Sequence, residues 1–224
     1  MTKAHSLRGL LTDCTSSITF GHARARDCLS HPSVRLNVSS LAADTGITRV
    51  TANAWLSVLE ASHLVFLTSP WFTNLSKRLI KTPKLYFVDP GLAGWLIGIR
   101  RQEHLIAHPQ RGALFENWVM TELLKAQTNR GIKPRLYFLR DKEGHEIDAF
   151  VETAPRCFHA VEIKAGETVA ADFFRGLDYW RDALKGESIT PWVVYGGSAS
   201  QERDRGRVLP WTDLGSMLSG FSGN

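Results

Sequence analysis

The apolar positions between residues 39 and 59 follow a helical period that is interrupted at Gly46. This pattern predicts two short helices joined by a glycine-containing turn. Ser39 or Ser40 can cap the first helix, and Thr48 can cap the second, because their side-chain oxygens accept hydrogen bonds from the free backbone N–H groups of a first turn.

Two extended apolar segments come next, and they predict a β-hairpin. They are His63–Leu67 and Lys84–Val88. Two helices followed by a hairpin predict a winged helix, but the second helix carries a single basic residue, Arg49, which favours a packing or protein-contact role over the reading of DNA bases. We expect the basic residues of the loop and hairpin to lie on a solvated wing or to touch a nucleic-acid backbone; they are Lys77, Arg78, Lys81 and Lys84.

The second half of the chain begins with a helical pattern from Gly112 to Gln127. Its apolar stripe is formed by Phe115, Val119, Met120, Leu123 and Ala126, with Asn117, Thr121 and Lys125 opposite. Glu116 falls inside that stripe. Three extended segments, a further helix and a buried strand follow, at Arg135–Arg140, His145–Glu152, Phe158–Lys164, Ala170–Leu184 and Pro191–Tyr195.

This order of elements predicts an α/β protein in which a helical or winged-helix segment precedes a mixed sheet flanked by helices. We place the boundary near residue 100, where Gly and Pro residues punctuate the chain, so that residues 1–100 form the first segment and residues 101–224 the second.

Composition adds little and excludes some classes of site. The formal charge of +5 is compatible with a nucleic-acid partner and equally with an ordinary solvated surface. The three cysteines are scattered, so they predict neither a disulfide framework nor a CxxC metal site. The sequence contains no long apolar run and its first residues lack the features of a secretory signal, so we expect a cytoplasmic protein without membrane contact.

Polar pairs interrupt two of the predicted strands. Side chains two apart on a strand share a face, so Glu162 and Lys164 lie together, as do Glu146 and Asp148. The apolar residues expected opposite this second pair are Ile147, Ala149 and Val151. If the hairpin turns near Pro155, Asp148 lies close to Glu162.

Glu116 projects toward the same sheet, so we expect one site formed by Glu116, Asp148, Glu162 and Lys164, with Glu146 as a further candidate. Buried carboxylates require a paired base or a cation. Mg²⁺ or Mn²⁺ fits the predicted ligands, which are Asp148, Glu162 and the backbone carbonyl of Ile163. Such an ion would activate water while Lys164 positions it, which is metal-assisted hydrolysis. The alternative is a salt bridge on an exposed sheet face.

Several segments of the chain resemble the C-terminal region of a bacterial and archaeal family of AAA+ type ATPases, known as domain of unknown function 4143. They are Leu36–Ala42, Lys81–Leu92, Gly112–Asn117, Glu146–Asp148 and Val161–Gly166. The resemblance implies a restriction-endonuclease-like PD-(D/E)xK core attached behind an ATPase module. It also implies that Glu116 is the helix carboxylate, that Asp148 is the central Asp, and that Glu162 and Lys164 form the ExK element.

The phosphate-binding GxxxxGK[ST] loop is missing from the 224 residues, so we expect no ATPase activity from this chain alone. The resemblance implies that residues 1–30 correspond to the tail of the family's ATPase lid or to a remnant of it. The functional prediction is a nuclease-like domain that hydrolyses phosphodiesters or binds DNA. The alternative is a catalytically inactive module that binds nucleic acid, a partner protein or a separate ATPase subunit.

Overall fold

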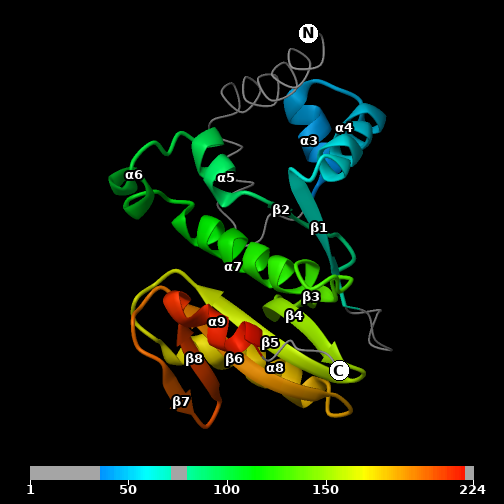
Figure 1. Cartoon of the computed structure of the whole chain (residues 1–224). Helices are drawn as coiled ribbons and strands as arrows, with labels where there is room; N and C mark the ends of the chain where they lie inside the picture. Colours follow the sequence, from blue (N-terminus) through cyan, green and yellow to red (C-terminus); the bar gives the residue numbers. More distant parts are fainter. Residues whose placement is uncertain (1–35, 72–79, 220–224) are drawn as a thin grey trace.

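The computed structural model describes residues 36–71 and 80–219 (Figure 1). The predictions for residues 1–30, Lys77 and Arg78 lie outside these ranges. The helices are α3 (Val38–Thr45), α4 (Arg49–Ala61), α5 (Pro90–Leu96), α6 (Gln102–Ile106), α7 (Arg111–Thr128), α8 (Arg175–Ala183) and α9 (Leu214–Ser219), with 3-10 turns η1 (Ala171–Phe174) and η2 (Trp211–Asp213). The strands are β1 (Val65–Pro70), β2 (Lys84–Phe87), β3 (Leu136–Arg140), β4 (Glu146–Ala154), β5 (Cys157–Lys164), β6 (Ser188–Tyr195), β7 (Gln201–Arg203) and β8 (Gly206–Pro210).

The strands form one mixed sheet of eight in the order β2-β1-β3-β4-β5-β6-β8-β7. Its centre is the predicted antiparallel meander of β3, β4 and β5. β6 then pairs parallel with β5 and with β8, and α8 makes the crossover from β5 to β6. The mixed α/β class is therefore confirmed, whereas the restriction-endonuclease-like assignment stays a prediction.

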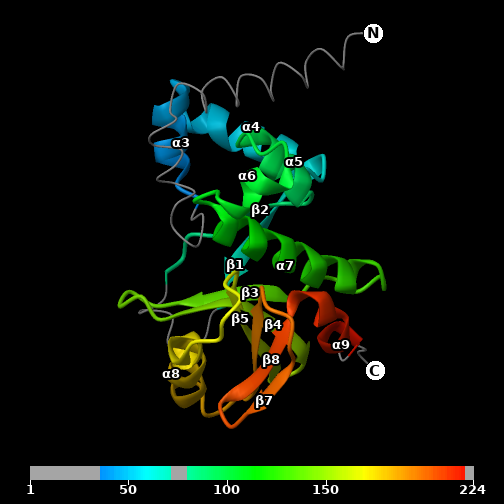
Figure 2. The same cartoon turned by 90° about the vertical axis from the view of Figure 1, so that its left-hand side faces the viewer.

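Helices cover both faces of the sheet (Figure 2). On one face, α7 and α9 bury an apolar cluster that includes Val119, Met120, Leu123, Ala149, Val151, Val161, Ile163 and Met217. On the other face, α8 buries Ile147, Phe150, Phe158, Ala160, Leu177, Trp180 and Val193. The core strands are apolar on both faces because neither face meets water over the middle of the sheet.

The two helices near the start of the described chain agree with the helical pattern and differ in one cap. Asn37 caps α3 by accepting a hydrogen bond from the Ser40 N–H at 3.1 Å, in place of Ser39 or Ser40. Gly46 ends the helix with φ of 70°, a left-handed conformation that glycine adopts at little cost. Thr48 caps α4 as predicted.

The predicted hairpin strands β1 and β2 pair antiparallel, but the pair does not stand apart from the second half of the chain. β1 continues past β2 and pairs parallel with β3 at Ser69 and Pro70. The pair is thus one edge of the main sheet, and the winged-helix comparison stays a prediction. No helix within residues 36–71 and 80–219 is long and apolar enough to cross a membrane.

A side chain of α7 covers the outer edge of β2. The Asn117 amide accepts a hydrogen bond from the Phe87 N–H and donates one to the Phe87 carbonyl, both at 2.8 Å, and Thr121 donates to the same carbonyl at 3.1 Å. Asn117 and Thr121, predicted to lie opposite the apolar stripe of α7, are buried because that side of the helix faces β2.

Candidate functional site

The candidate site lies where β4 and β5 separate. The paired residues of the two strands end at Ala149 opposite Val161. Beyond them, Asp148 Oδ2 accepts a hydrogen bond from the Ile163 N–H at 2.8 Å, so a side chain replaces the backbone carbonyl that would continue the sheet. The predicted ligand at Ile163 was its carbonyl, whereas the contact that the structure places at Asp148 is made by its N–H.

A bulge in β4 sets the direction of Asp148. Tyr137 pairs with Phe150 and Leu139 pairs with Ile147, so β4 has one more residue than β3 between these two pairs. The prediction that Ile147, Ala149 and Val151 share a face is therefore wrong. Ile147 lies on the α8 face and the other two on the α7 face, where Asp148 also meets the side chain of Lys84.

Lys84 is the centre of the acidic cluster. Its Nζ lies 2.6 Å from Glu146 Oε1, 3.0 Å from Glu116 Oε1 and 3.9 Å from Asp148 Oδ1, and its side chain has no exposed surface. The prediction that Lys84 lies on a solvated wing is wrong. Its ammonium instead neutralises carboxylates from β4 and α7, and this also makes Glu146 a closer member of the cluster than predicted.

Tyr86 lies on the same side of β2 and completes this cluster. Its hydroxyl donates a hydrogen bond to Glu116 Oε1 at 2.7 Å, so that oxygen accepts from both Tyr86 and Lys84. Burial raises the pKa of Glu116 to about 7, although the Lys84 charge acts in the opposite direction. With this oxygen engaged by protein groups, Glu116 acts through Lys84 and Tyr86.

Glu162 and Lys164 form a second ion pair, on the face of β5 opposite Val161 and Ile163. The Glu162 side chain is 12% exposed and that of Lys164 is 36% exposed. Glu162 Oε2 is buried and has no hydrogen-bond partner. Burial raises the pKa of Glu162 to about 8, with a further contribution from the negative charge of Asp148.

The first turn of α8 covers Glu162 closely because it contains Gly176. A Cβ at this position would lie 2.1 Å from the Glu146 carbonyl oxygen and 3.7 Å from Glu162 Oε2. A larger residue would push the helix away from the separation between β4 and β5.

Asp148 links the two ion-paired groups electrostatically. Burial raises its pKa, and the charges of Lys84 and Lys164 oppose this effect. Conversely, Asp148 and Glu162 raise the pKa of Lys164 above its usual value although burial acts to lower it. The four predicted residues therefore influence one another, but Glu116 and Asp148 share Lys84 whereas Glu162 contacts Lys164.

The sequence reasoning missed Lys84, Tyr86 and Arg140 as members of the site. Arg140 pairs with Glu146 Oε2 at 2.6 Å. A signal for the first two was present, because Lys84 and Tyr86 are two apart on a strand and must share a face. Nothing in the sequence says that this face turns toward α7.

The donor atoms near Asp148 and Glu162 fit a hard divalent ion. Both residues offer carboxylate oxygens, and Glu162 Oε2 is buried without a partner. Four carboxyl groups, those of Glu116, Glu146, Asp148 and Glu162, meet three cationic side chains, those of Lys84, Arg140 and Lys164. One carboxyl group therefore has no cationic side chain to balance it, and a bound cation would stabilise its ionised form.

A second group with metal-ligand chemistry lies at the turn between β3 and β4. Single ligand atoms of Asp141, Glu143 and His145 lie within 4.8 Å of one another. His145 Nδ1 is 2.9 Å from Asp141 Oδ2, and its ring stacks on Tyr179 with centroids 3.7 Å apart. Hydrogen bonds that the Asp141 carboxylate accepts within the turn account for this arrangement.

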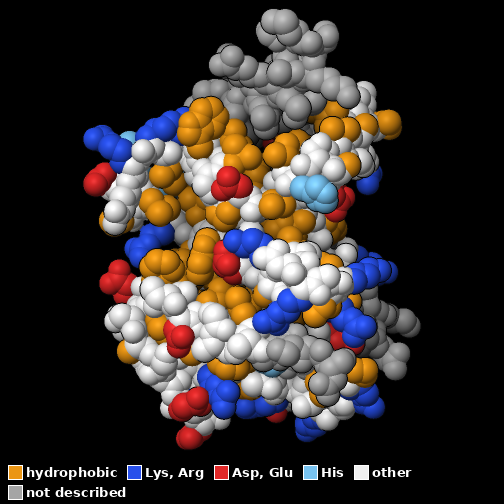
Figure 3. All heavy atoms as spheres, in the orientation of Figure 1, with side chains coloured by type: hydrophobic (Ala, Val, Ile, Leu, Met, Phe, Trp, Pro, Cys, Tyr) orange, Lys and Arg blue, Asp and Glu red, His pale blue; other side chains and the backbone are white. Residues whose placement is uncertain are grey.

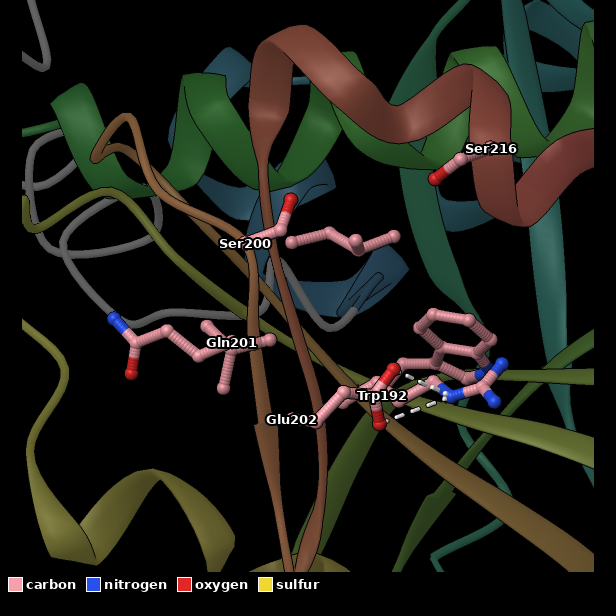
Figure 4. Close-up of a pocket in the computed structure, with 8 residues that line it drawn as sticks. Trp192, Ser200, Gln201, Glu202 and Ser216 are labelled. Atoms are coloured by element: carbon pink, nitrogen blue, oxygen red, sulfur yellow. Dashed lines mark hydrogen bonds and ion pairs between the residues drawn. The ribbon is translucent and has the colours of Figure 1, made fainter.

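Two cavities border β6. A cavity of about 240 Å³ is lined by residues that include Trp192, Ser200, Glu202, Arg207 and Ser216 (Figure 4). Arg207 is held there by Glu202 at 3.1 Å and lies over the Trp192 ring. A second cavity adjoins Glu167 and Gly197. Neither is lined by the four predicted site residues.

Comparisons with known proteins match two parts of the chain. Residues 111–214 match the family described as Domain of unknown function (DUF4143), and residues 25–103 match Domain of unknown function (DUF8612). The first match confirms the resemblance to domain of unknown function 4143.

The curated relatives include the uncharacterized proteins Mb2031c of Mycobacterium bovis and Rv2008c of Mycobacterium tuberculosis, each 32% identical over 131 residues. The alignment covers 58% of this chain and 28% of each relative, so the chain spans less than a third of their length. No solved structure matches the chain.

Proposed function

We propose that the chain carries a divalent-metal-dependent site for phosphodiester hydrolysis in nucleic acid, located where β4 and β5 separate. The observation that supports this most directly is the buried, unpartnered Glu162 Oε2 beside Asp148. A buried carboxylate oxygen without a donor is costly, and a hard cation is the partner that its chemistry favours.

Each residue then has a defined task. Asp148 and Glu162 would hold Mg²⁺ or Mn²⁺, and the ion would supply an activated water and charge neutralisation at the phosphate. The Ile163 N–H fixes the orientation of the Asp148 carboxylate through the hydrogen bond at 2.8 Å. Lys164, which is partly exposed, can donate a hydrogen bond to a phosphate oxygen or orient the water.

The test follows cleavage of single- and double-stranded DNA and RNA by the purified chain with Mg²⁺, with Mn²⁺ and with a chelator. We expect metal-dependent cleavage that falls by about 10²-fold or more in Asp148→Asn and in Lys164→Met. Glu152→Gln is the matched control, because Glu152 lies on the same strand and pairs with Arg135 outside the site. Absence of cleavage by folded wild type across these substrates would refute the proposal.

A non-catalytic interaction module is the second candidate, and two observations support it. Lys84 already neutralises part of the acidic cluster. In addition, six large apolar side chains on or beside α3 to α6 are exposed, and apolar atoms gather over these helices in Figure 3. These residues are Leu41, Val50, Val58, Trp95, Leu105 and Ile106. Under this candidate, a partner protein such as a separate ATPase subunit binds this surface, and Asp148→Asn leaves binding unchanged.

A further inference from the structure

We propose that the Lys84 ammonium is a built-in cation that takes the place of a second metal ion, so that the site accepts a single divalent ion. This inference rests on the proposed function, and its test separates the two. Lys84 Nζ meets carboxylates from two elements: it donates a charge-assisted hydrogen bond to Glu116 of α7 at 3.0 Å and forms an ion pair with Glu146 of β4 at 2.6 Å.

Asp148 lies beside the Lys84 ammonium and also senses the second ion pair. Asp148 Oδ1 is 3.9 Å from Lys84 Nζ, and its electrostatic partners on the other side are Glu162 and Lys164. Asp148 therefore stands between a resident ammonium and Glu162, the residue with which we assign it to hold the metal ion.

The surroundings of Lys84 make its charge permanent. The side chain is fully buried, the Tyr86 hydroxyl stabilises Glu116 beside it, and the Phe138 ring lies 5.2 Å from Nζ. The adjacent carboxylates favour the charged form strongly enough to offset burial, so the pKa of Lys84 is raised well above its usual value. Unlike a bound ion, this cation cannot dissociate.

A consequence distinguishes this role from ordinary packing. Shortening Lys84 to alanine leaves Glu116, Glu146 and Asp148 facing a space without a cation, and a divalent ion can enter it. Lys84→Met also removes the charge but fills the space with an apolar chain of similar length. A role in packing alone predicts that methionine is tolerated better than alanine and that metal ions affect neither variant.

The experiment measures the Mn²⁺ stoichiometry by calorimetry, and Tm with and without Mn²⁺, for wild type, Lys84→Ala and Lys84→Met. All three carry Glu143→Gln, which removes a ligand from the other metal-ligating group. We expect one bound ion in wild type and two in Lys84→Ala, with Mn²⁺ restoring most of the lost Tm in that variant and little in Lys84→Met.

The two proposals fail differently. If wild type binds one ion and Lys84→Ala also binds one, the inference about Lys84 is overturned and the proposed function stands. If wild type binds none while Lys84→Ala gains one ion and regains Tm, Lys84 does occupy a cation position, but the single-ion site and the proposed function both fail. Two ions in wild type, or a Lys84→Ala chain that stays unfolded with Mn²⁺, would also overturn the inference.

Discussion

Two lysine–carboxylate groups lie on either side of Asp148, and they differ in their access to solvent. The side chain of Lys84 is fully buried with Glu116 at 6% exposure, whereas Lys164 is 36% and Glu162 is 12% exposed. Both groups carry the same kinds of charge, so chemistry alone does not separate them. Burial does, because a sealed ion pair contributes to the fold while an accessible one can also meet a substrate.

The two groups also differ in how the free-energy cost of their buried carboxylates is offset. Buried carboxylates cost several kcal/mol each unless they are paired. Lys84 and Tyr86 share that cost at Glu116, and Arg140 shares it at Glu146, whereas Glu162 Oε2 is left without a hydrogen-bond partner. This residual demand for positive charge is the physical basis of the proposed metal site.

The largest effect is expected for Lys84→Met. Removing the Lys84 charge leaves buried carboxylates without their cation, so we expect a loss of about 3–5 kcal/mol in the free energy of unfolding. Urea denaturation measures it, with Lys125→Met as the control, since Lys125 forms an exposed pair with Glu122 on α7. A loss for Lys84→Met no larger than the control's would show that the sealed cluster does not stabilise the fold.

Tyr86→Phe is expected to reduce stability less than Lys84→Met does. It deletes the hydroxyl that donates to Glu116 Oε1 and keeps the ring that stacks on Phe66 with centroids 5.4 Å apart. A hydrogen bond to a charged group contributes about 1.5–3 kcal/mol. Denaturation of this variant should therefore give an intermediate loss, and an unchanged stability would argue that Glu116 is protonated or satisfied elsewhere.

Lys164→Met should affect stability least of the three substitutions. Its ion pair with Glu162 is partly exposed, and such pairs contribute about 0–1 kcal/mol. The same variant is expected to lose the proposed cleavage, so stability and activity separate here. If Lys164→Met destabilises as much as Lys84→Met, the two groups are equivalent and the comparison fails.

A pH dependence of stability tests Glu162, and Glu116, whose pKa burial raises to about 7, adds a decline of the same sign. The pKa of Glu162 is raised to about 8 mainly by burial, so the folded state binds its proton more tightly than the unfolded state does. Its contribution to stability is present below the ordinary glutamate pKa of about 4.5 and is lost as pH rises through about 8. Denaturation between these values should show a decline that Glu162→Gln reduces and that added Mg²⁺ opposes.

Local patterns predicted most of the elements because each depends on nearby residues. The helix that became α7 and the meander of β3 to β5 follow from apolar period and turn residues. Short elements such as α6, β7 and β8 were missed, because Gln201–Arg203 and Gly206–Pro210 are too brief to show a period. Their formation depends on the pairing of β8 with β6, which is a long-range contact.

The sequence predicted the carboxylates of the candidate site and Lys164, but it did not predict Lys84. Strand alternation identified the Glu162–Lys164 pair, and the position of Glu116 in an apolar stripe indicated a buried carboxylate. The placement of Lys84 could not be predicted, because it requires β2 to return beside α7 across 32 residues of sequence. The bulge in β4 was equally hidden, since it arises from the register with β3.

The amide of Asn117 has a consequence for the behaviour of the protein at high concentration. An unpaired strand edge is a template on which another chain can add its own strand, the step that begins domain swapping and fibril growth. At β2, the two backbone groups of Phe87 that would receive such a strand are already occupied. The opposite edge, β7, is three residues long and ends in Arg203. A strand from another chain would therefore find few free backbone groups at either edge of the sheet.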